Sequence, residues 1–299
     1  MNNIVENLRK VVVEDLFNTS TFNKCWDVWV NDVHKFIGET PTPQSILNLG
    51  DHLSEIFTTT GTSGRDQSDL SGGGTAWECL IVWYLNLCFS GTRVVACKKM
   101  SHVPSPIRDA ITVNYSNFSC TTESDITIVV FPDDVKYTTD PSQFMKSKGT
   151  KIDMEKLSEA VTMDFSDFEI GIIQCKTNWN DNAQIPMLWD MIYSAGGFGK
   201  RQISLGRNGF SLSDIPFTYS FVTVPSNKKA IYKFTSLAVK RVINLSGGNY
   251  WGKETQNGIA RSVKEIFHNY RGGYQNGVIK NTLPSLIEGL NSDFSYFNI

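Results

Sequence analysis

The chain has 299 residues, of which 40% are hydrophobic and 19% are charged, and its formal net charge is −2. This composition excludes a disordered chain and a coiled coil, and the length allows one large domain or two modest ones. The longest apolar stretch, Glu78 to Phe89, is too short for a membrane span, which needs about 20 residues. No basic segment followed by an apolar one marks a signal peptide, so a soluble, cytoplasmic protein is expected.

The N-terminal part of the sequence predicts helices. Residues 3–58 have apolar side chains at helical spacing, with a third helix expected from Pro43 to Phe57. The glycine-rich stretch from Gly61 to Thr75 has no apolar periodicity and predicts a loop. An apolar helix follows from Thr75 to Cys88.

The rest of the chain predicts strands interrupted by helices. Strands are expected at Arg93 to Cys97, Asp125 to Phe131, Phe168 to Lys176, Tyr219 to Val224, Ala230 to Phe234 and Leu237 to Leu245. Helices are expected at Ala183 to Tyr193, Ile259 to Tyr270 and Pro284 to Leu290. This order predicts an α/β protein with a central mixed sheet flanked by helices. Residues 1–60 form a helical N-terminal extension and residues 61–299 a core, unless the two are one single domain.

The cysteines and histidines give no sign of a metal centre. The histidines are isolated, and the cysteines include no CxxC pair and mostly lie in apolar runs. Reduced core thiols in a cytosolic protein are therefore favoured over disulfides or a zinc site. The six cysteines are Cys25, Cys79, Cys88, Cys97, Cys120 and Cys175.

Positive charge is concentrated in one part of the sequence. Residues 196–281 contain 13 lysines and arginines but only three acids. So basic a segment predicts an anion-binding surface, most naturally for nucleic acid, although lysines are also ordinary surface residues.

Two of the predicted strands carry polar residues suited to phosphodiester hydrolysis. Asp125 opens one strand, and Gln174 and Lys176 close another, with side chains on the same face. A lysine that closes a buried strand beside a carboxylate is costly unless its charge is used. Asp125 and the Gln174 carbonyl could bind Mg²⁺ through oxygen. Lys176 could orient or deprotonate the attacking water and offset developing negative charge.

Over residues 75–195 the chain resembles the PD-(D/E)XK nuclease superfamily, which includes many type II restriction endonucleases. The family pattern is an acid on a core strand, a (D/E)-x-K tripeptide on the next, and often a glutamate on the preceding helix. These fall on Asp125, on Gln174 and Lys176, and on Glu78. Gln174 departs from the pattern because it replaces the second acid. The resemblance implies a central sheet of restriction-endonuclease type and Mg²⁺ held by Asp125, Gln174 and Glu78.

Each of these residues also has a purely structural interpretation. Glu78 could close a capping box with Thr75 at the start of a helix. Asp125 could end a turn, and Lys176 could be the first solvated residue after a strand.

Further residues are candidates for nucleic-acid binding. Gly73 and Gly74 lead into the predicted helix at Thr75, whose free amides attract phosphate. Other candidates are the pair Trp179 and Asn180 just after the predicted strand that ends at Lys176, Lys200 and Arg201 in a glycine-rich turn, and the pair Lys228 and Lys229.

The sequence therefore predicts a Mg²⁺-dependent DNA endonuclease of a restriction or phage-defence system. The expected assembly is a homodimer, with a methyltransferase or helicase as a possible partner. The alternative is a nucleic-acid-binding module that keeps the fold but little or no catalysis. A protein-interaction scaffold is a weaker third option.

Overall fold

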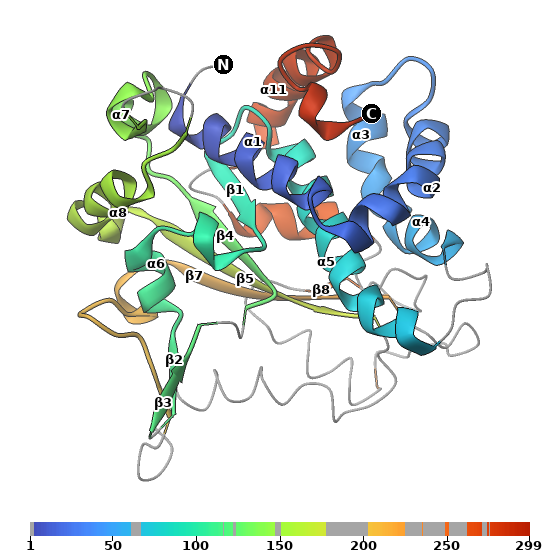
Figure 1. Ribbon diagram of the computed structural model, residues 1–299. Helices are drawn as coiled ribbons and strands as arrows, with labels where there is room; N and C mark the ends of the chain where they lie inside the picture. Colours follow the sequence, from blue (N-terminus) through green and yellow to red (C-terminus); the bar gives the residue numbers. More distant parts are fainter. Residues whose placement is uncertain are drawn as a thin grey trace.

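The computed structural model describes residues 3–60, 67–115, 117–121, 124–146, 151–177, 203–224, 235, 249–250, 262–270, 274 and 276–299. It shows an α/β protein in which helices pack on a mixed sheet (Figure 1). The helices are α1 (Ile4–Phe17), α2 (Ser20–Ile37), α3 (Pro43–Asn48), α4 (Leu53–Thr59), α5 (Gln67–Phe89), α6 (Ser105–Ala110), α7 (Val135–Thr138), α8 (Met154–Met163) and α11 (Asn276–Glu288). Short 3₁₀ helices include Leu49–Asp51, Val263–Asn269 and Ser295–Phe297.

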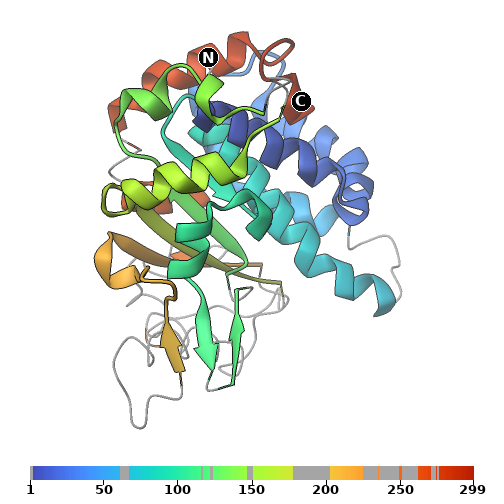
Figure 2. The ribbon, with the colours of Figure 1, turned by 60° about the vertical axis from the view of Figure 1, so that its left-hand side comes forward.

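The strands form two sheets. The larger has the order β1-β4-β5-β7-β8, in which β1, β4 and β5 are antiparallel neighbours and β5, β7 and β8 are parallel. A smaller antiparallel sheet, β3-β2-β6, projects to one side of it (Figures 1 and 2). The strands are β1 (Val94–Cys97), β2 (Val113–Tyr115), β3 (Phe118–Cys120), β4 (Ile126–Val130), β5 (Glu169–Lys176), β6 (Ile203–Leu205), β7 (Phe217–Thr223) and β8 (Asn249–Tyr250).

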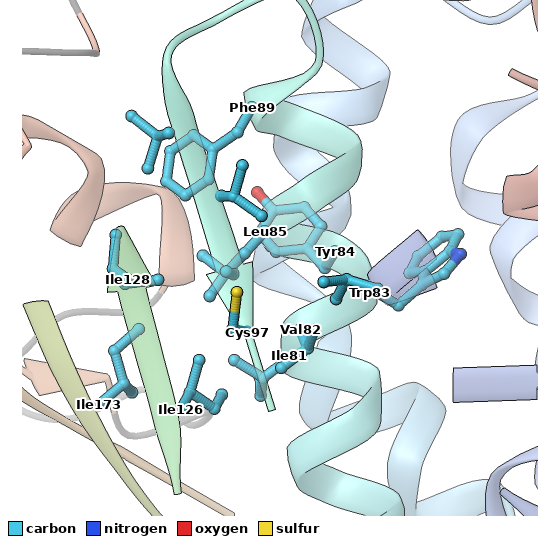
Figure 3. Packing of buried hydrophobic residues seen from close by; sticks show 14 of the residues in the cluster. Ile81, Val82, Trp83, Tyr84, Leu85, Phe89, Cys97, Ile126, Ile128 and Ile173 are labelled. Atoms are coloured by element: carbon cyan, nitrogen blue, oxygen red, sulfur yellow. The ribbon is translucent and has the colours of Figure 1, made fainter. Parts of the chain in front are cut away.

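Helix α5 is the central helix of the core. Every side chain from Ala76 to Phe89 is buried except that of Glu78. A helix that is apolar on all sides is stable only when other elements surround it. Figure 3 shows one side of α5, with Ile81 and Leu85, packed toward Ile128 of β4 and Ile173 of β5.

The N-terminal helices share this core. Leu8 of α1, Trp29 of α2 and Trp83 of α5 belong to the same buried cluster as the strands. The C-terminal residues are hydrogen-bonded to these helices: Trp83 Nε1 donates to Phe297 O (3.0 Å), and Trp26 Nε1 donates to Asn298 O (3.2 Å). The hydrophobic core therefore runs without interruption across residue 60.

The outer edge of β1 is closed by side chains. Asn86 of α5 donates to Ala96 O (2.8 Å) and accepts from Ala96 N (3.1 Å). Arg9 of α1 donates to Thr92 O and Val94 O, both at 3.0 Å. The backbone groups that an edge strand normally exposes are thus hydrogen-bonded within the chain.

The predicted strands in the described part of the chain are found within one or two residues of their expected bounds. One helix prediction and one loop prediction are wrong. The helix expected from Pro43 to Phe57 is divided into α3, a 3₁₀ turn and α4, and the expected loop from Gly61 to Thr75 overlaps α5, which begins at Gln67. Between Ile259 and Tyr270 the described part is the 3₁₀ helix. The predicted elements at Ala183 to Tyr193, Ala230 to Phe234 and Leu237 to Leu245 lie outside the described residues.

The cysteines have the expected surroundings. All six are free, and all except the half-buried Cys120 are buried. Burial raises the pKa of Cys79, Cys88 and Cys97 to about 12, so these thiols remain protonated and unreactive. No helix among the described residues is long and apolar enough to cross a bilayer.

A close contact at Gly171 gives a test of the sheet. A Cβ at this position of β5 would lie 2.6 Å from Tyr270 Cε1 and 3.1 Å from Ile128 Cβ. We expect Gly171→Ala to lower the free energy of unfolding by about 1–3 kcal/mol, because a well-packed core resists added volume. Denaturant unfolding measures the change. Gly74→Ala, in α5 with no atom within 4 Å of the new Cβ, is the control and should stabilise by up to about 1 kcal/mol.

Candidate functional site

Strand register brings polar residues from three adjacent strands to one end of the large sheet. Cys97 pairs with Thr127, and Ile126 pairs with Ile173. The end of β1, the start of β4 and the end of β5 therefore lie side by side. Lys98 follows β1, Asp125 precedes β4, and Gln174 and Lys176 close β5.

Asp125 and Gln174, 49 positions apart in the sequence, are in direct contact. Asp125 Oδ2 accepts a hydrogen bond from Gln174 Nε2 and another from Cys175 N (2.7 Å). Tyr219 OH of β7 donates to Gln174 Oε1 (3.2 Å). Gln174 is 2% exposed and Tyr219 5% exposed, so this chain of hydrogen bonds lies almost entirely away from solvent.

The amide of Gln174 is oriented with its nitrogen, not its oxygen, toward Asp125. To ligate a cation beside Asp125, as the sequence predicts, the amide has to turn so that Oε1 takes the place of Nε2. The Tyr219 hydroxyl permits this turn, because it can accept a hydrogen bond from the amide nitrogen as well as donate one to the oxygen.

The carboxyl group of Asp125 is strongly perturbed. The pKa of Asp125 is raised to about 6, chiefly by burial and also by the negative charge of Glu78. The Cys175 amide and the charges of Lys176 and Lys98 act in the opposite direction. Perturbed carboxyl groups of this kind are frequent at functional sites, where nearby charges and burial are combined.

Glu78 reaches the same place from α5, where it forms an ion pair with Lys98. Each of the two side chains is 19% exposed. Burial alone would lower the pKa of Lys98, but the hydrogen bond and charge of Glu78 outweigh it, and the pKa lies above the ordinary value. Lys98 is a residue that the sequence interpretation missed, although its place directly after the predicted strand Arg93 to Cys97 was a usable signal.

The structure excludes two interpretations of the start of α5. Because the helix begins at Gln67, Thr75 and Glu78 lie in its interior and cannot form an N-terminal capping box. Gly73 and Gly74 lie in its second turn, past the helix end where free amides and the positive dipole attract phosphate. The helix N-terminus on which the predicted phosphate site rests therefore does not lie at these glycines.

Lys176 is held by its backbone rather than by its side chain. Its carbonyl accepts from Thr223 Oγ1 (2.9 Å) and from Val224 N (3.0 Å). In the part of the chain that the structure describes, its ammonium has no hydrogen-bond acceptor or ion-pair partner. The other candidates for nucleic-acid contact, Trp179, Asn180, Lys200, Arg201, Lys228 and Lys229, lie outside the described residues.

The oxygen atoms of Asp125, Glu78 and Gln174 are of the chemical type that binds a hard divalent cation. Two carboxylates and one amide oxygen are ligands that Mg²⁺ accepts, with water completing the coordination. The high pKa of Asp125 shows a carboxylate that lacks full compensation for its burial. Among the described residues, however, no three acidic, histidine or cysteine side chains come together as a metal site.

Neither the protein-family models nor the curated proteins nor the solved structures compared with this chain contain a match.

Proposed function

We propose that the protein is a Mg²⁺-dependent endonuclease that hydrolyses phosphodiester bonds in DNA, as part of a restriction or phage-defence system. The observation that carries the proposal is the meeting of Glu78, Asp125, Gln174 and Lys176 at one end of the sheet, although they span almost 100 positions in the sequence.

The order of elements supports a sheet of restriction-endonuclease type. The family pattern expects a glutamate on a helix, an acid on a core strand and a (D/E)-x-K tripeptide on the next strand, in which Gln174 replaces the acid. Here Glu78 lies on α5, Asp125 directly precedes β4, and Gln174 and Lys176 lie at the end of β5, which is hydrogen-bonded to β4.

The proposed roles follow from position and charge. Asp125, Glu78 and the Gln174 carbonyl would hold Mg²⁺, which when bound activates water and stabilises negative charge on phosphate. Lys176 is suited to orient the attacking water and to offset charge on the phosphate, because its ammonium is not engaged by the described part of the protein. Tyr219 contacts the Gln174 amide from the far side and could accept a hydrogen bond from its nitrogen once the oxygen has turned toward the cation.

One observation favours the second candidate, a nucleic-acid-binding module with weak or no catalysis. Gln174 supplies no negative charge, and Glu78 is already neutralised by Lys98. In such a module DNA would be retained without Mg²⁺ and no product would form.

Incubation of plasmid and phage DNA with the protein, in Mg²⁺ or in EDTA, tests the proposal. We expect cut DNA in Mg²⁺ only, with ends that can be mapped. Gln174→Glu separates the two candidates, because it restores the acid of the family pattern beside Asp125. We expect cleavage by this variant to equal or exceed that of the wild type. DNA binding with no product in both proteins would support the binding module.

A further inference from the structure

Four charged side chains form the site, and their formal charges cancel. The two acids are Glu78 and Asp125, and the two bases are Lys98 and Lys176. In the sheet, β4 lies between β1 and β5. Asp125 is therefore flanked by β1, which Lys98 directly follows, and by β5, which ends in Lys176. The two lysines differ in their contacts: Lys98 is bonded to Glu78, whereas Lys176 has no acceptor among the described residues.

The Lys98 ammonium occupies the carboxylate that a divalent cation would need. Lys98 Nζ lies against Glu78 Oε2, and both side chains are largely shielded from water. It is also close enough to Asp125 and Cys175 to act electrostatically on both. A metal ion that binds Glu78 and Asp125 together would meet this positive charge at short range, where weak solvent screening makes repulsion strong.

We propose that Lys98 is a built-in competitor for the divalent cation. In the metal-free protein its ammonium neutralises Glu78, and it has to leave this carboxylate before Glu78 can join Asp125 as a ligand. The inference rests on the proposed function, since it assumes that Glu78 and Asp125 share a cation. Lys98 thereby sets the metal concentration at which the site fills.

Calorimetric titration of the full chain with Mn²⁺, in the absence of DNA, tests this role without reference to activity. We expect Lys98→Met, which keeps the length of the side chain and removes its charge, to lower the Kd for Mn²⁺ at least tenfold. Lys98→Gln should act in the same direction, which guards against a folding defect peculiar to one variant. Circular dichroism and thermal unfolding verify that each variant is folded.

The next residue provides a matched control. Lys99 is also a lysine in an ion pair, with its Nζ 2.6 Å from Asp15 Oδ2, but it is half exposed and its partner is Asp15 rather than a site residue. Lys99→Met should leave the Kd for Mn²⁺ unchanged. In a Glu78→Gln background, where the contested carboxylate is gone, Lys98→Met should lower the Kd by much less than tenfold, because only the longer-range effect of its charge on Asp125 remains.

Unchanged or weaker Mn²⁺ binding by Lys98→Met would overturn the inference, as would the absence of Mn²⁺ binding in both proteins. Plasmid cleavage by the wild type shows whether the competitor role or the proposed nuclease function has failed. If the wild type cuts DNA in Mg²⁺ and Lys98→Met has the wild-type Kd for Mn²⁺, the competitor role is refuted and the nuclease proposal stands. A tenfold tighter Kd without any cleavage retains the competitor role and refutes the nuclease.

Discussion

Replacing Lys176 with alanine is expected to lower the rate of DNA cleavage at least about 100-fold, while folding and DNA binding stay nearly intact. Loss of a group that stabilises charge in the transition state has effects of this size. The fold should tolerate the change, because Lys176 is tied to β7 through its backbone carbonyl and not through its ammonium. Single-turnover cleavage in Mg²⁺, with a parallel binding titration in Ca²⁺ or EDTA, measures the two effects separately.

Lys10→Ala is a suitable control for the loss of one positive charge. Lys10 lies on α1, is 52% exposed and forms a loose surface ion pair with Glu14. Cleavage should stay at the wild-type rate in this variant. A Lys176→Ala protein that cuts as fast as the wild type would refute the assignment of the site.

Asp125→Asn is expected to abolish cleavage together with Mg²⁺ binding. Asp125 is the carboxylate at the centre of the site, in contact with Gln174 and under the influence of Glu78, Lys98 and Lys176. An asparagine keeps the hydrogen bond from Cys175 N but supplies no charge to a cation. Cleavage assays and Mn²⁺ titration follow the loss. If the variant cuts normally, the metal is held elsewhere, with Asp133, Asp134 or Glu169 as the next residues to replace.

The same substitution should stabilise the fold in a pH-dependent way. Burial raises the pKa of Asp125 from 3.8 to about 6, so the ionised carboxylate destabilises the folded state above pH 6 and this cost disappears as the pH falls toward 4. Asparagine never carries the charge. We therefore expect the free energy of unfolding of Asp125→Asn to exceed that of the wild type at pH 8, by at most on the order of 3 kcal/mol, and to match it near pH 4. Denaturant unfolding at the two pH values measures the difference. An equal difference at both pH values would contradict the assigned pKa.

Much of the candidate site could be predicted because it depends on strand alternation. The β-branched runs before Phe131 and Lys176 specify buried strands, and period two then places Gln174 and Lys176 on one face. The contact between Asp125 and Gln174 follows once β4 and β5 pair in register. The orientation of the Gln174 amide could not be predicted, because it depends on a hydrogen bond from Tyr219 of β7, a partner that no local sequence pattern identifies.

The errors at the two helices have different causes. The helix expected from Pro43 to Phe57 is interrupted where Tyr84 of α5 donates to Leu47 O (2.7 Å), a carbonyl that a continuous helix would use for the amide of Asp51. Helix α5 continues through its glycines because each residue added to an existing helix gains a hydrogen bond without a new nucleus. The position of Lys98 directly after a predicted strand could have marked it as a candidate, but its ion pair with Glu78 of α5 does not follow from the strand pattern.

The closed edge of β1 limits how two copies of this protein can assemble. A nuclease that cuts both strands of a palindromic DNA site would most simply act as a twofold dimer. Many sheet proteins dimerise by pairing their edge strands, but Asn86 and Arg9 already occupy the outward backbone groups of β1. A dimer of this chain therefore has to be built through side-chain contacts or at another part of the molecule, and not by extending the sheet across β1.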